Sequence, residues 1–389
     1  MRFKQIVKET LDHYVENADS PHITNARDTL IDMAARHRKP WLYAVSKFYG
    51  QFYPAMNNVV FSTDIDADIA SLRTSRTPIV YVANHVSNLD SLVLVTQFLE
   101  HDLPYPVFVA GKNLFTNWIS SLRLKSAGAF KFDAASWSKD PDYKTLANSY
   151  FQALLENDVP LMVFPEGTRS RAGNLKVFKE GVLSTVLDTF FKNKISDDPT
   201  IDDILFVPLG LAYAKVPEDA VYVRGLSKSE KGDLMSDFSE KSVVPDPIYL
   251  HVGAPVSAKE MFKDYVPEES NLIHVARDFA AYLRLQVRLN VPVLESDVVK
   301  HAIHSLAEEH GTDTLDEQTV AERTAQLIHM ATSNKQYVRS HKTKFSDYIS
   351  RLHDSHIVRR DKKRLVVKQK GLLKYYSTRF KSITHTGTT

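Results

Sequence analysis

The chain has no cysteine among its 389 residues. Disulfide bonds, thiolate metal sites and a cysteine nucleophile are therefore excluded. Long apolar runs are also missing, because no segment approaches the roughly 20 apolar residues that a membrane-spanning helix needs. Residues 1–8 read MRFKQIVK, in which charges recur too often for the apolar part of a secretory signal peptide. We therefore expect neither a transmembrane helix nor a signal peptide.

The composition is typical of a globular protein, with 43% hydrophobic and 25% charged residues. The longest uncharged run covers residues 48–63 and is rich in aromatic side chains, and Trp41 and Tyr43 precede it. Aromatic side chains are favoured where membrane meets water, so this stretch suits a membrane surface. A helix packed on the main core would explain the same pattern, and both interpretations stay open.

Charge is distributed unevenly along the chain. From Lys335 onward there are 15 Lys and Arg but only 3 Asp and Glu, whereas the preceding residues hold 34 basic and 44 acidic side chains. A basic tail on an acidic body suits an anionic partner, either lipid headgroups or nucleic acid. Only charge favours nucleic acid, so we expect no nucleic-acid partner and a tail that attaches peripherally to anionic membranes.

Short apolar runs alternate with longer amphipathic stretches in the middle of the chain. The short runs suit strands covered on both faces, and the longer stretches have the apolar spacing of helices. This alternation predicts an α/β fold, with a mixed sheet flanked by helices on both faces. The expected strands are residues 79–83, 107–110, 161–164, 204–213 and 249–253, and the expected helices are residues 92–99, 117–125, 143–155 and 181–192.

Breaks in the pattern predict how the chain is divided. Helical patterns outside the α/β region are interrupted near Pro21, Pro292 and Gly311. The four predicted parts are an N-terminal helical segment that suits a membrane interface (1–63), the α/β domain (64–270), a helical C-terminal extension (271–354) and a basic tail whose last residues should fray (355–389).

The most informative stretch, residues 84–90, reads NHVSNLD. His85 follows a predicted strand, and ligands of open α/β sheets bind at the carboxyl ends of strands. Near neutral pH an imidazole can take the proton of a hydroxyl, which makes the hydroxyl a nucleophile. Asp90 can reach back over one turn to the second ring nitrogen and stabilise the imidazolium. In a purely structural alternative, His85 ends a strand and Asp90 caps the next helix.

A second motif, residues 164–171, reads FPEGTRSR and follows another predicted strand. Gly167 permits a tight loop, and Arg169 and Arg171 offer planar donors that fit phosphate oxygens. We expect Glu166 to orient Arg169 or a substrate hydroxyl. Alternatively, the arginines lie on a solvated turn and Glu166 is an ordinary salt-bridge partner. Further positive charge in this loop comes from Lys176 and Lys179.

The two motifs together resemble the first and third signature blocks of the glycerophospholipid acyltransferase superfamily. They stand in the expected order, about 80 positions apart. The resemblance implies that His85 is the catalytic base, that Asp90 orients it, and that the third block binds the glycerol phosphate of the acceptor. The residues that it assigns to the acceptor are Glu166, Gly167, Thr168 and Arg169.

Further matches favour one subgroup, the glycerol-3-phosphate and dihydroxyacetone-phosphate acyltransferases. Residues 110–114 (AGKNL) and 127–130 (AGAF) resemble its second block, and residues 207–213 (VPLGLAY) with 216–218 (VPE) resemble its fourth. The resemblance covers about residues 77–330.

Two features depart from that subgroup and put the acceptor in doubt. Its second block normally ends with an arginine, whereas this chain has only Lys131 nearby. The opening of the first motif and residues 178–181 (FKEG) look more like 1-acylglycerol-3-phosphate acyltransferases. The more numerous matches outside the shared blocks favour glycerol 3-phosphate, with lysophosphatidic acid as the alternative acceptor.

The resemblance implies transfer of a fatty acyl group from acyl-CoA or acyl carrier protein to glycerol 3-phosphate in phospholipid biosynthesis. The alternative acceptor would yield phosphatidic acid. A non-catalytic lipid-binding protein is a weaker alternative, since it would be expected to have lost His85 or Asp90. We expect a peripheral protein on the cytoplasmic side of a membrane, without metal or other cofactor. The side chains expected to help Arg169 hold the phosphate are Lys112, Lys131, Arg171 and Lys179.

Overall fold

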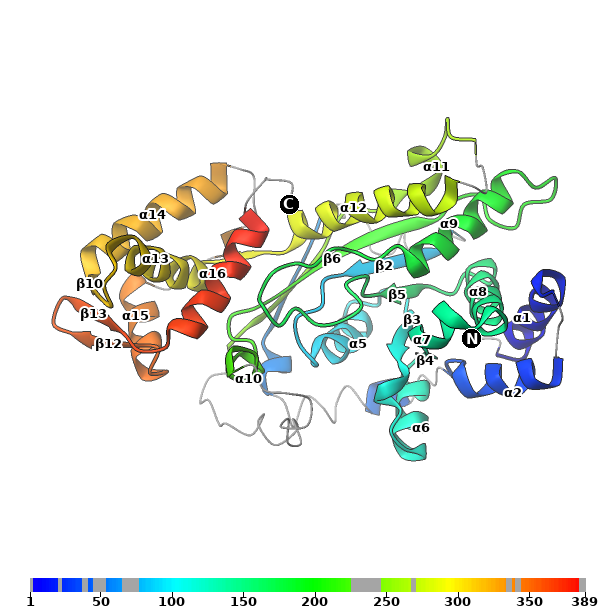
Figure 1. The fold of residues 1–389 in the computed structure, drawn as a ribbon, viewed down its shortest axis with the longest axis horizontal. Coiled ribbons are helices and arrows are strands. Elements are labelled where there is room, and N and C mark those ends of the chain that lie inside the picture. Colours follow the sequence, from blue (N-terminus) through cyan, green and yellow to red (C-terminus); the bar gives the residue numbers. More distant parts are fainter. Residues whose placement is uncertain are drawn as a thin grey trace.

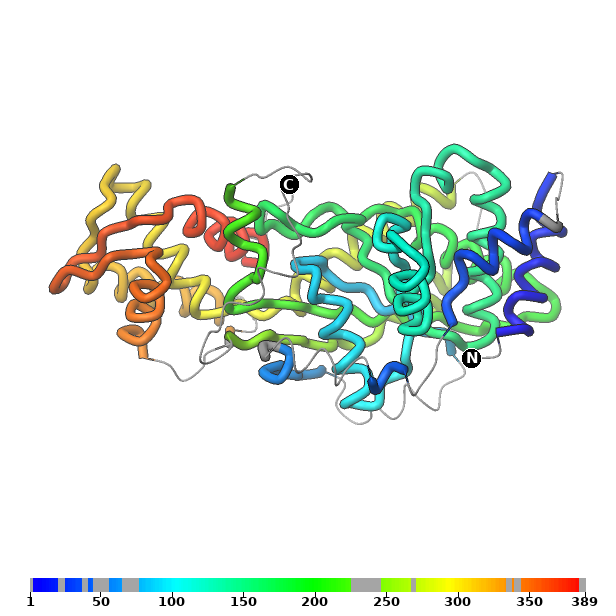
Figure 2. The backbone as a smooth tube through the Cα atoms, turned by 90° about the horizontal axis from the view of Figure 1, so that it is seen from below, coloured from blue at the N-terminus to red at the C-terminus, as the bar shows by residue number. Residues whose placement is uncertain are grey.

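The computed structural model describes residues 3–19, 23–36, 41–44, 54–64, 77–224, 246–266, 271–333, 338–339 and 344–384. In these ranges the molecule is elongated, with a sheet at its centre, N-terminal helices at one end and C-terminal helices at the other (Figure 1). Figure 2 shows the same backbone after a quarter turn. Residues 48–53 of the run predicted to suit a membrane surface, which hold four of its five aromatic side chains, lie outside the described residues, whereas residues 54–63 are placed.

A mixed eight-stranded sheet forms the centre of the described structure. Its strands are β1 (Val59–Thr63), β2 (Ile79–Ala83), β3 (Val107–Gly111), β4 (Ala129–Phe132), β5 (Leu161–Val163), β6 (Leu205–Tyr213), β7 (Ile248–Val252) and β8 (Val256–Ser257). They follow the order β1-β7-β6-β2-β5-β3-β4, with β8 paired to β6. The strands from β6 to β4 run parallel, whereas β7 is antiparallel to β6. The carboxyl ends of the parallel strands therefore meet at one edge.

Apolar side chains of the sheet enter separate clusters on its two faces. In β2, Val80 and Val82 belong to one cluster, whereas Ile79 and Tyr81 belong to the other. This division follows from the alternation of side chains along a strand. Strand β2 is buried over its whole length because helices cover both faces.

Helices cover each face of the sheet (Figure 1). The first face carries α8 (Pro141–Glu156), α9 (Gly181–Lys194) and α12 (Leu272–Asn290), and α1 (Phe3–Asn17) and α2 (Ile23–Met33) pack beside α8. The second face carries α5 (Asp90–Glu100). The shorter elements are the 3₁₀ turns η1 (Pro54–Asn57) and η2 (Lys112–Leu114), and the helices α6 (Trp118–Ser126), α7 (Ala134–Lys139), α10 (Asp219–Arg224) and α11 (Ala258–Met261).

The C-terminal part has an apolar cluster of its own. A three-stranded sheet of order β10-β13-β12 packs with helices there, and a two-stranded sheet joins β9 to β11. The elements are β9 (Val293–Leu294), α13 (Glu295–His310), β10 (Thr314–Asp316), α14 (Glu317–Ser333), β11 (Val338–Arg339), α15 (Phe345–Asp354), β12 (Val358–Asp361), β13 (Arg364–Val367) and α16 (Lys370–Thr384).

The predicted α/β fold with a mixed sheet and helices on both faces is confirmed. Each strand predicted in the middle of the chain is present, as β2, β3, β5, β6 or β7, and the predicted helices are present as α5, α6, α8 and α9. The predicted breaks near Pro292 and Gly311 separate α12, α13 and α14. The four-part division of the chain stays a prediction.

Two segments differ from the helical and tail patterns predicted for them. Residues 59–63 were assigned to the N-terminal helical segment, yet they form strand β1, which pairs with β7. Neighbouring β-branched residues such as Val59 and Val60 suit a strand once a partner edge is available.

The other segment is the predicted basic tail, which is folded from Ser355 to Thr384. Its hairpin β12–β13 carries exposed basic side chains, and α16 buries an apolar stripe that includes Leu373, Tyr376 and Phe380. Their spacing places them on one side of a helix, so the segment packs on the body despite its net positive charge.

No helix among the described residues combines the length and the apolar character that crossing a bilayer requires.

Candidate active site

His85 lies just beyond the carboxyl end of β2. The preceding residue, Asn84, is buried, and its side chain donates to the carbonyl of Leu211 (2.9 Å) and accepts from the Leu211 N–H (2.8 Å). These two bonds tie the chain to β6 after the strand has ended. The backbone that carries His85 is therefore fixed to the sheet.

His85 and Asp90 form a hydrogen-bonded pair, as the sequence predicted. The distance from His85 Nδ1 to Asp90 Oδ2 is 2.7 Å. Asp90 is fully buried at the start of α5, and its Oδ2 also accepts the backbone N–H groups of Val86 (2.7 Å) and Ser87 (3.0 Å). An ionised carboxylate only accepts hydrogen bonds, so Nδ1 is the donor of this bond, and the neutral ring in this tautomer has its lone pair on Nε2.

Tyr213, at the end of β6, completes the shell around Asp90. Its hydroxyl donates to Asp90 Oδ1 over 2.6 Å. Burial, and then the charge of Asp90, raise the pKa of Tyr213 well above its usual value, so the phenol stays protonated as a donor. In the sequence, Tyr213 is part of the segment that resembles the fourth block, with no sign of a role of its own. Its spacing from Asp90 along the chain gave no sign of the contact.

The imidazole of His85 is packed but reachable. Its ring stacks on Phe164, with centroids 4.5 Å apart and planes 27° apart. The side chain is still 23% exposed, in contrast to the fully buried Asp90. An exposed ring edge beside a buried carboxylate is the arrangement that a general base needs to meet a substrate hydroxyl.

Glu166 makes main-chain contacts that the sequence did not predict. Its oxygens accept the backbone N–H groups of His85 (2.7 Å) and Lys176 (3.0 Å), and its expected role toward Arg169 or a substrate hydroxyl stays a prediction. The Ser170 N–H in turn donates to the His85 carbonyl over 2.8 Å. Burial raises the pKa of Glu166 to about 7, against the effect of these two N–H donors. Glu166 therefore joins the two predicted motifs through their main chains.

Arg169 is held beside the first motif by Glu218, a residue whose role the sequence did not indicate. Arg169 Nη1 lies 3.3 Å from Glu218 Oε1 and 3.1 Å from the Tyr222 hydroxyl. Glu218 also accepts the Ser87 hydroxyl and the Asn88 N–H, each over 2.8 Å. Both contacts of Arg169 use Nη1, so other guanidinium donors can meet an anion.

The rest of the second motif forms a cationic turn. Gly167 has φ of +71°, which glycine adopts without strain, and its N–H donates to the Phe164 carbonyl. Lys176 Nζ donates to Thr168 Oγ1 (2.6 Å) and to the Arg169 carbonyl (2.7 Å). The Lys179 ammonium lies next to Gly167, where an added Cβ would be 3.2 Å from it. Burial, and then the nearby cations Arg171 and Lys179, lower the pKa of Lys176.

Lys112 and Lys131 lie on more distant strands of the same sheet and pair with other residues. Lys112 follows β3 and pairs with Asp133, whereas Lys131 in β4 lies 2.7 Å from Asp32. With strands about 4.8 Å apart, β3 and β4 are roughly 10 and 14 Å from β2. The structure thus gathers Gly167, Thr168, Arg169 and Lys179 near His85, and not these two lysines.

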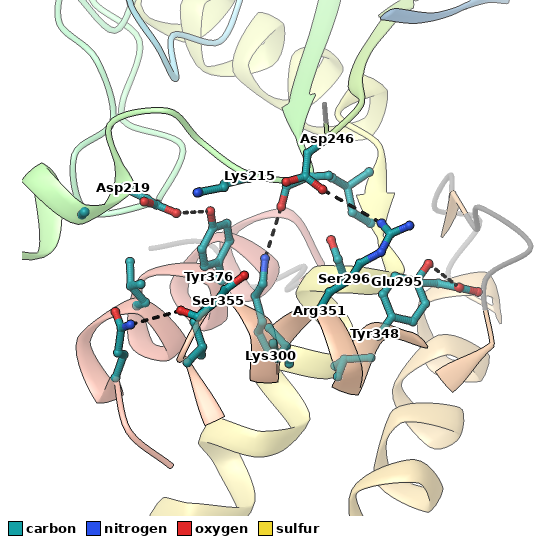
Figure 3. Close-up of a pocket in the computed structure, with 18 of the residues that line it drawn as sticks. Lys215, Asp219, Asp246, Glu295, Ser296, Lys300, Tyr348, Arg351, Ser355 and Tyr376 are labelled. Carbon is teal, nitrogen blue, oxygen red and sulfur yellow. Dashed lines mark hydrogen bonds and ion pairs between the residues drawn. The ribbon is translucent and has the colours of Figure 1, made fainter. Parts of the chain in front are cut away.

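The cavity shown in Figure 3 is separate from this site. It measures about 280 Å³ and lies between the end of β6, α10 and the C-terminal elements α13, α15 and α16. Its charged groups largely pair among themselves, as Arg351 does with Asp246 at 4.0 Å. Burial lowers the pKa of Lys300 there to about 8. Neither His85 nor Arg169 lines this cavity.

Metal binding was not expected for this chain. Within the described residues, no three His, Asp or Glu side chains are grouped as ligands of one metal ion. A reaction without metal or cofactor stays a prediction.

Part of the chain matches a known protein family. Residues 65–212 match the family model named Acyltransferase, which covers the β2 to β6 region and both motifs. Residues 65–212 are thus similar to the Acyltransferase family, in agreement with the resemblance seen in the sequence.

The relatives that match this chain are named for two different acceptors. The chain is 30% identical over 190 residues to the dihydroxyacetone phosphate acyltransferase of Mus musculus, which covers 47% of this chain and 27% of the relative. It is 32% identical over 160 residues to the mitochondrial glycerol-3-phosphate acyltransferase 1 of Sus scrofa, which covers 40% of this chain and 19% of the relative. The matches thus span about a quarter or less of these relatives.

Proposed function

We propose that the protein is an O-acyltransferase that moves a fatty acyl group from an acyl thioester to a hydroxyl of glycerol 3-phosphate. One observation carries this proposal. The buried Asp90 holds a partly exposed His85, and the second motif, whose Glu166 binds the His85 N–H, also carries Arg169. A base beside a phosphate-binding guanidinium suits a phosphorylated alcohol better than an ordinary alcohol.

The proposed transfer is a sequence of two proton transfers around the formation of the ester and the cleavage of the thioester. His85 Nε2 takes the proton of the acceptor hydroxyl, and the oxygen attacks the thioester carbonyl carbon. The C–S bond then breaks, the ester forms, and the imidazolium returns the proton to the departing thiolate. Asp90 stabilises the imidazolium throughout, because its carboxylate already faces Nδ1 at 2.7 Å.

In this proposal the cationic turn binds the phosphate of the acceptor. Arg169 supplies planar donors, and Lys179 and Arg171 add charge at the same edge. Holding the phosphate fixes the acceptor hydroxyl near His85, so that proximity supplies much of the rate. Direct help from Lys112 and Lys131 is a weaker part of the proposal, since both are engaged with Asp133 and Asp32.

The identity of the acceptor is the most specific part of the proposal. Relatives named for glycerol 3-phosphate and for dihydroxyacetone phosphate match this chain at nearly equal identity, which makes dihydroxyacetone phosphate the second candidate. Lysophosphatidic acid remains the alternative suggested by the opening of the first motif. The donor is acyl-CoA or acyl carrier protein, and the protein works peripherally at an anionic membrane on the cytoplasmic side.

The test is an acyl-transfer assay with glycerol 3-phosphate, dihydroxyacetone phosphate and 1-acylglycerol 3-phosphate in parallel. We expect the highest kcat/KM with glycerol 3-phosphate. His85→Ala should lower kcat by about 10²–10⁴-fold with an unchanged thermal midpoint. Arg169→Ala should raise the acceptor KM by about tenfold or more, because a charged hydrogen bond is lost.

Either of two results would contradict the proposal. The first is substantial transfer by a folded His85→Ala protein, and the second is no transfer to any of the three acceptors. Preference for another of the three would keep the reaction and change its acceptor.

A further inference from the structure

Large apolar side chains gather on the outside of α6 and the turn before it. Trp118 is 75% exposed, and Leu114, Ile119 and Leu122 are 43–53% exposed. Trp118 and Leu122 are four residues apart, and Ile119 and Leu122 are three apart, so they share one side of the helix. Figure 1 shows α6 projecting from the body below β4.

The helix is anchored independently of these exposed residues. Asn117 and Ser120 form a reciprocal capping box at its start. Phe115 and Ser126 are buried on either side, and Lys125 pairs with Asp32 at 3.3 Å. The outward apolar side chains are therefore presented by a formed helix rather than needed to fold it.

Residues 41–44 extend this surface. The Trp41 indole N–H donates to the Arg123 carbonyl over 3.3 Å, and the Arg36 N–H donates to the Lys125 carbonyl over 2.8 Å. Trp41 and Tyr43 are themselves exposed. We call the combined surface the α6 patch; its members are Trp41, Tyr43, Leu114, Trp118, Ile119 and Leu122.

Charge around the patch is positive. Residues 103–132 contain no Asp or Glu. Four basic residues lie in that stretch, and the acidic neighbours that pair with them are Asp32 and Asp133. Arg123 is exposed within α6 itself. Aromatic and aliphatic side chains beside a small net positive charge complement a bilayer with anionic headgroups.

The patch lies on the edge of the sheet that carries the candidate active site. Helix α6 follows β3, whose carboxyl end faces the same way as that of β2, which leads into His85. A protein docked through α6 would keep this edge close to the lipid from which a fatty acyl chain or a lipid acceptor arrives.

We propose that the α6 patch is the membrane-docking surface of this protein, with Trp118 and Leu122 inserted among anionic headgroups. The proposal gives a location to the peripheral association inferred above, and binding can be measured without any catalysis. Six large apolar residues against few exposed cations favour a bilayer over an acidic carrier protein, for which charge pairing would dominate.

The test is flotation of the full-length protein with phosphatidylcholine vesicles that contain phosphatidylglycerol. Trp118→Ser with Leu122→Ser should weaken partitioning about tenfold or more at low and at high salt, because apolar insertion is not screened. Arg123→Ser should weaken it about fivefold at low salt only. The matched control is Ile195→Ser, which removes a similarly exposed apolar side chain where α9 ends, near the opposite edge of the sheet.

A variant of the basic hairpin β12–β13 tests the competing explanation, in which the hairpin binds the membrane. Replacing Lys362, Lys363 and Arg364 with Ser removes three exposed charges without touching the core. We expect less loss of binding than from the α6 double variant. A larger loss from the hairpin variant, with the α6 variant unaffected, would overturn the proposal.

Fluorescence tests insertion directly. With Trp41 and Trp137 replaced by Phe, Trp118 is the single tryptophan, and its emission should shift to the blue when vesicles are added. An unshifted emission, or binding of acyl carrier protein in place of vesicles, would count against the docking role. Transfer to a soluble acceptor from a short-chain thioester should survive the α6 substitutions, which separates this proposal from that of the reaction.

Discussion

Asp90 accepts four hydrogen bonds at a position without solvent exposure. Three come to Oδ2 from the imidazole of His85 and from the main chain of Val86 and Ser87, and one comes to Oδ1 from Tyr213. A buried carboxylate with this many donors has one orientation. The imidazole is therefore aligned before a substrate binds, which lowers the ordering that the reaction itself requires.

The Tyr213 hydroxyl can be tested by removing it. Tyr213→Phe leaves Asp90 Oδ1 buried without its donor, so we expect the free energy of unfolding to fall by about 1–3 kcal/mol. We also expect kcat to fall more than KM changes, because the His85–Asp90 pair is misaligned while the loop that carries Arg169 is intact. Thermal melts and steady-state kinetics measure the two effects.

Tyr81→Phe is the matched control for that substitution. Tyr81 is fully buried on the neighbouring strand, and its hydroxyl has no hydrogen-bond partner among the described residues. Losing it should leave stability and kcat nearly unchanged. Equal effects of the two substitutions would argue against a role for Tyr213 in holding Asp90.

Glu166 gives stability a dependence on pH. Its pKa is about 7 in the folded protein and 4.5 in an ordinary setting, so between these values the folded state holds a proton that the unfolded state lacks. The contribution of this group to stability therefore falls as pH rises from about 4.5 to 7. Glu166→Gln should remove that slope and cost about 1–3 kcal/mol through one lost N–H acceptor.

Melting temperatures between pH 5 and pH 8 measure the Glu166 effect. The difference between wild type and Glu166→Gln should shrink as pH rises and then level off above 7. Glu322→Gln, at an exposed site on α14, is the control and should follow wild type. Parallel curves for Glu166→Gln and wild type would contradict the assigned titration.

At the scale of elements, the loop that carries Arg169 is held between helices that lie outside the matched residues 65–212. Arg284 of α12 donates to the carbonyls of Lys176 (2.8 Å) and Leu175 (3.0 Å). On the other side the loop touches α16, where the Leu175 N–H donates to Ser382 Oγ over 3.3 Å. The loop that carries Arg169 thus depends on the C-terminal helices for its shape.

Gly173 marks the closest approach of this loop to α16. Its φ is +85°, and an added Cβ would lie 2.4 Å from the Tyr375 carbonyl oxygen. Gly173→Ala should therefore cost about 1–2 kcal/mol for the backbone conformation and a further 1–3 kcal/mol for the displaced helix. The acceptor KM should rise as well, since the shift passes along the loop toward Arg169.

Gly311→Ala separates these two costs. Gly311 also has positive φ, at +58°, but a Cβ there would meet nothing within 4 Å. This variant should show the conformational cost alone and normal kinetics. If the melting temperature fell equally in the two variants, the contact between Gly173 and α16 would add no cost, and this prediction would be wrong.

At the scale of the whole molecule, α16 joins parts that lie far apart in the sequence. Its apolar residues enter all three core clusters, with Leu373 in one, Tyr376 in the second and Phe380 in the third. Arg379 is buried and pairs with Asp297 of α13 at 2.6 Å, and it donates to the Tyr213 carbonyl over 2.7 Å. The C-terminal helix is thus bonded to the residue that holds Asp90.

This packing changes how the basic C-terminal region must be tested. Deleting residues 355–389 would remove the buried face of α16 along with the surface charges, so lost membrane binding would not report on charge. Substitution of the exposed hairpin lysines and arginine isolates the charges, because those side chains lie outside the core.

Sequence alone was sufficient for the features that depend on local pattern. Apolar runs predicted the strands that build the sheet, and the short spacing between His85 and Asp90 predicted their pairing. Five residues after the histidine, the first turn of a helix can place a carboxylate beside the imidazole whatever surrounds it. Both motifs also follow strands, so the edge of the sheet where they meet was predictable.

Tertiary structure alone decided which groups complete the site. Glu166 joins main-chain amides and Glu218 holds Arg169, because strands far apart in sequence become neighbours in the sheet. Lys112 and Lys131, which the resemblance to the second signature block had suggested, pair with other carboxylates because their strands lie further along it. Long-range contacts are set by the order of the strands and by packing, and neither leaves a periodic signal in the chain.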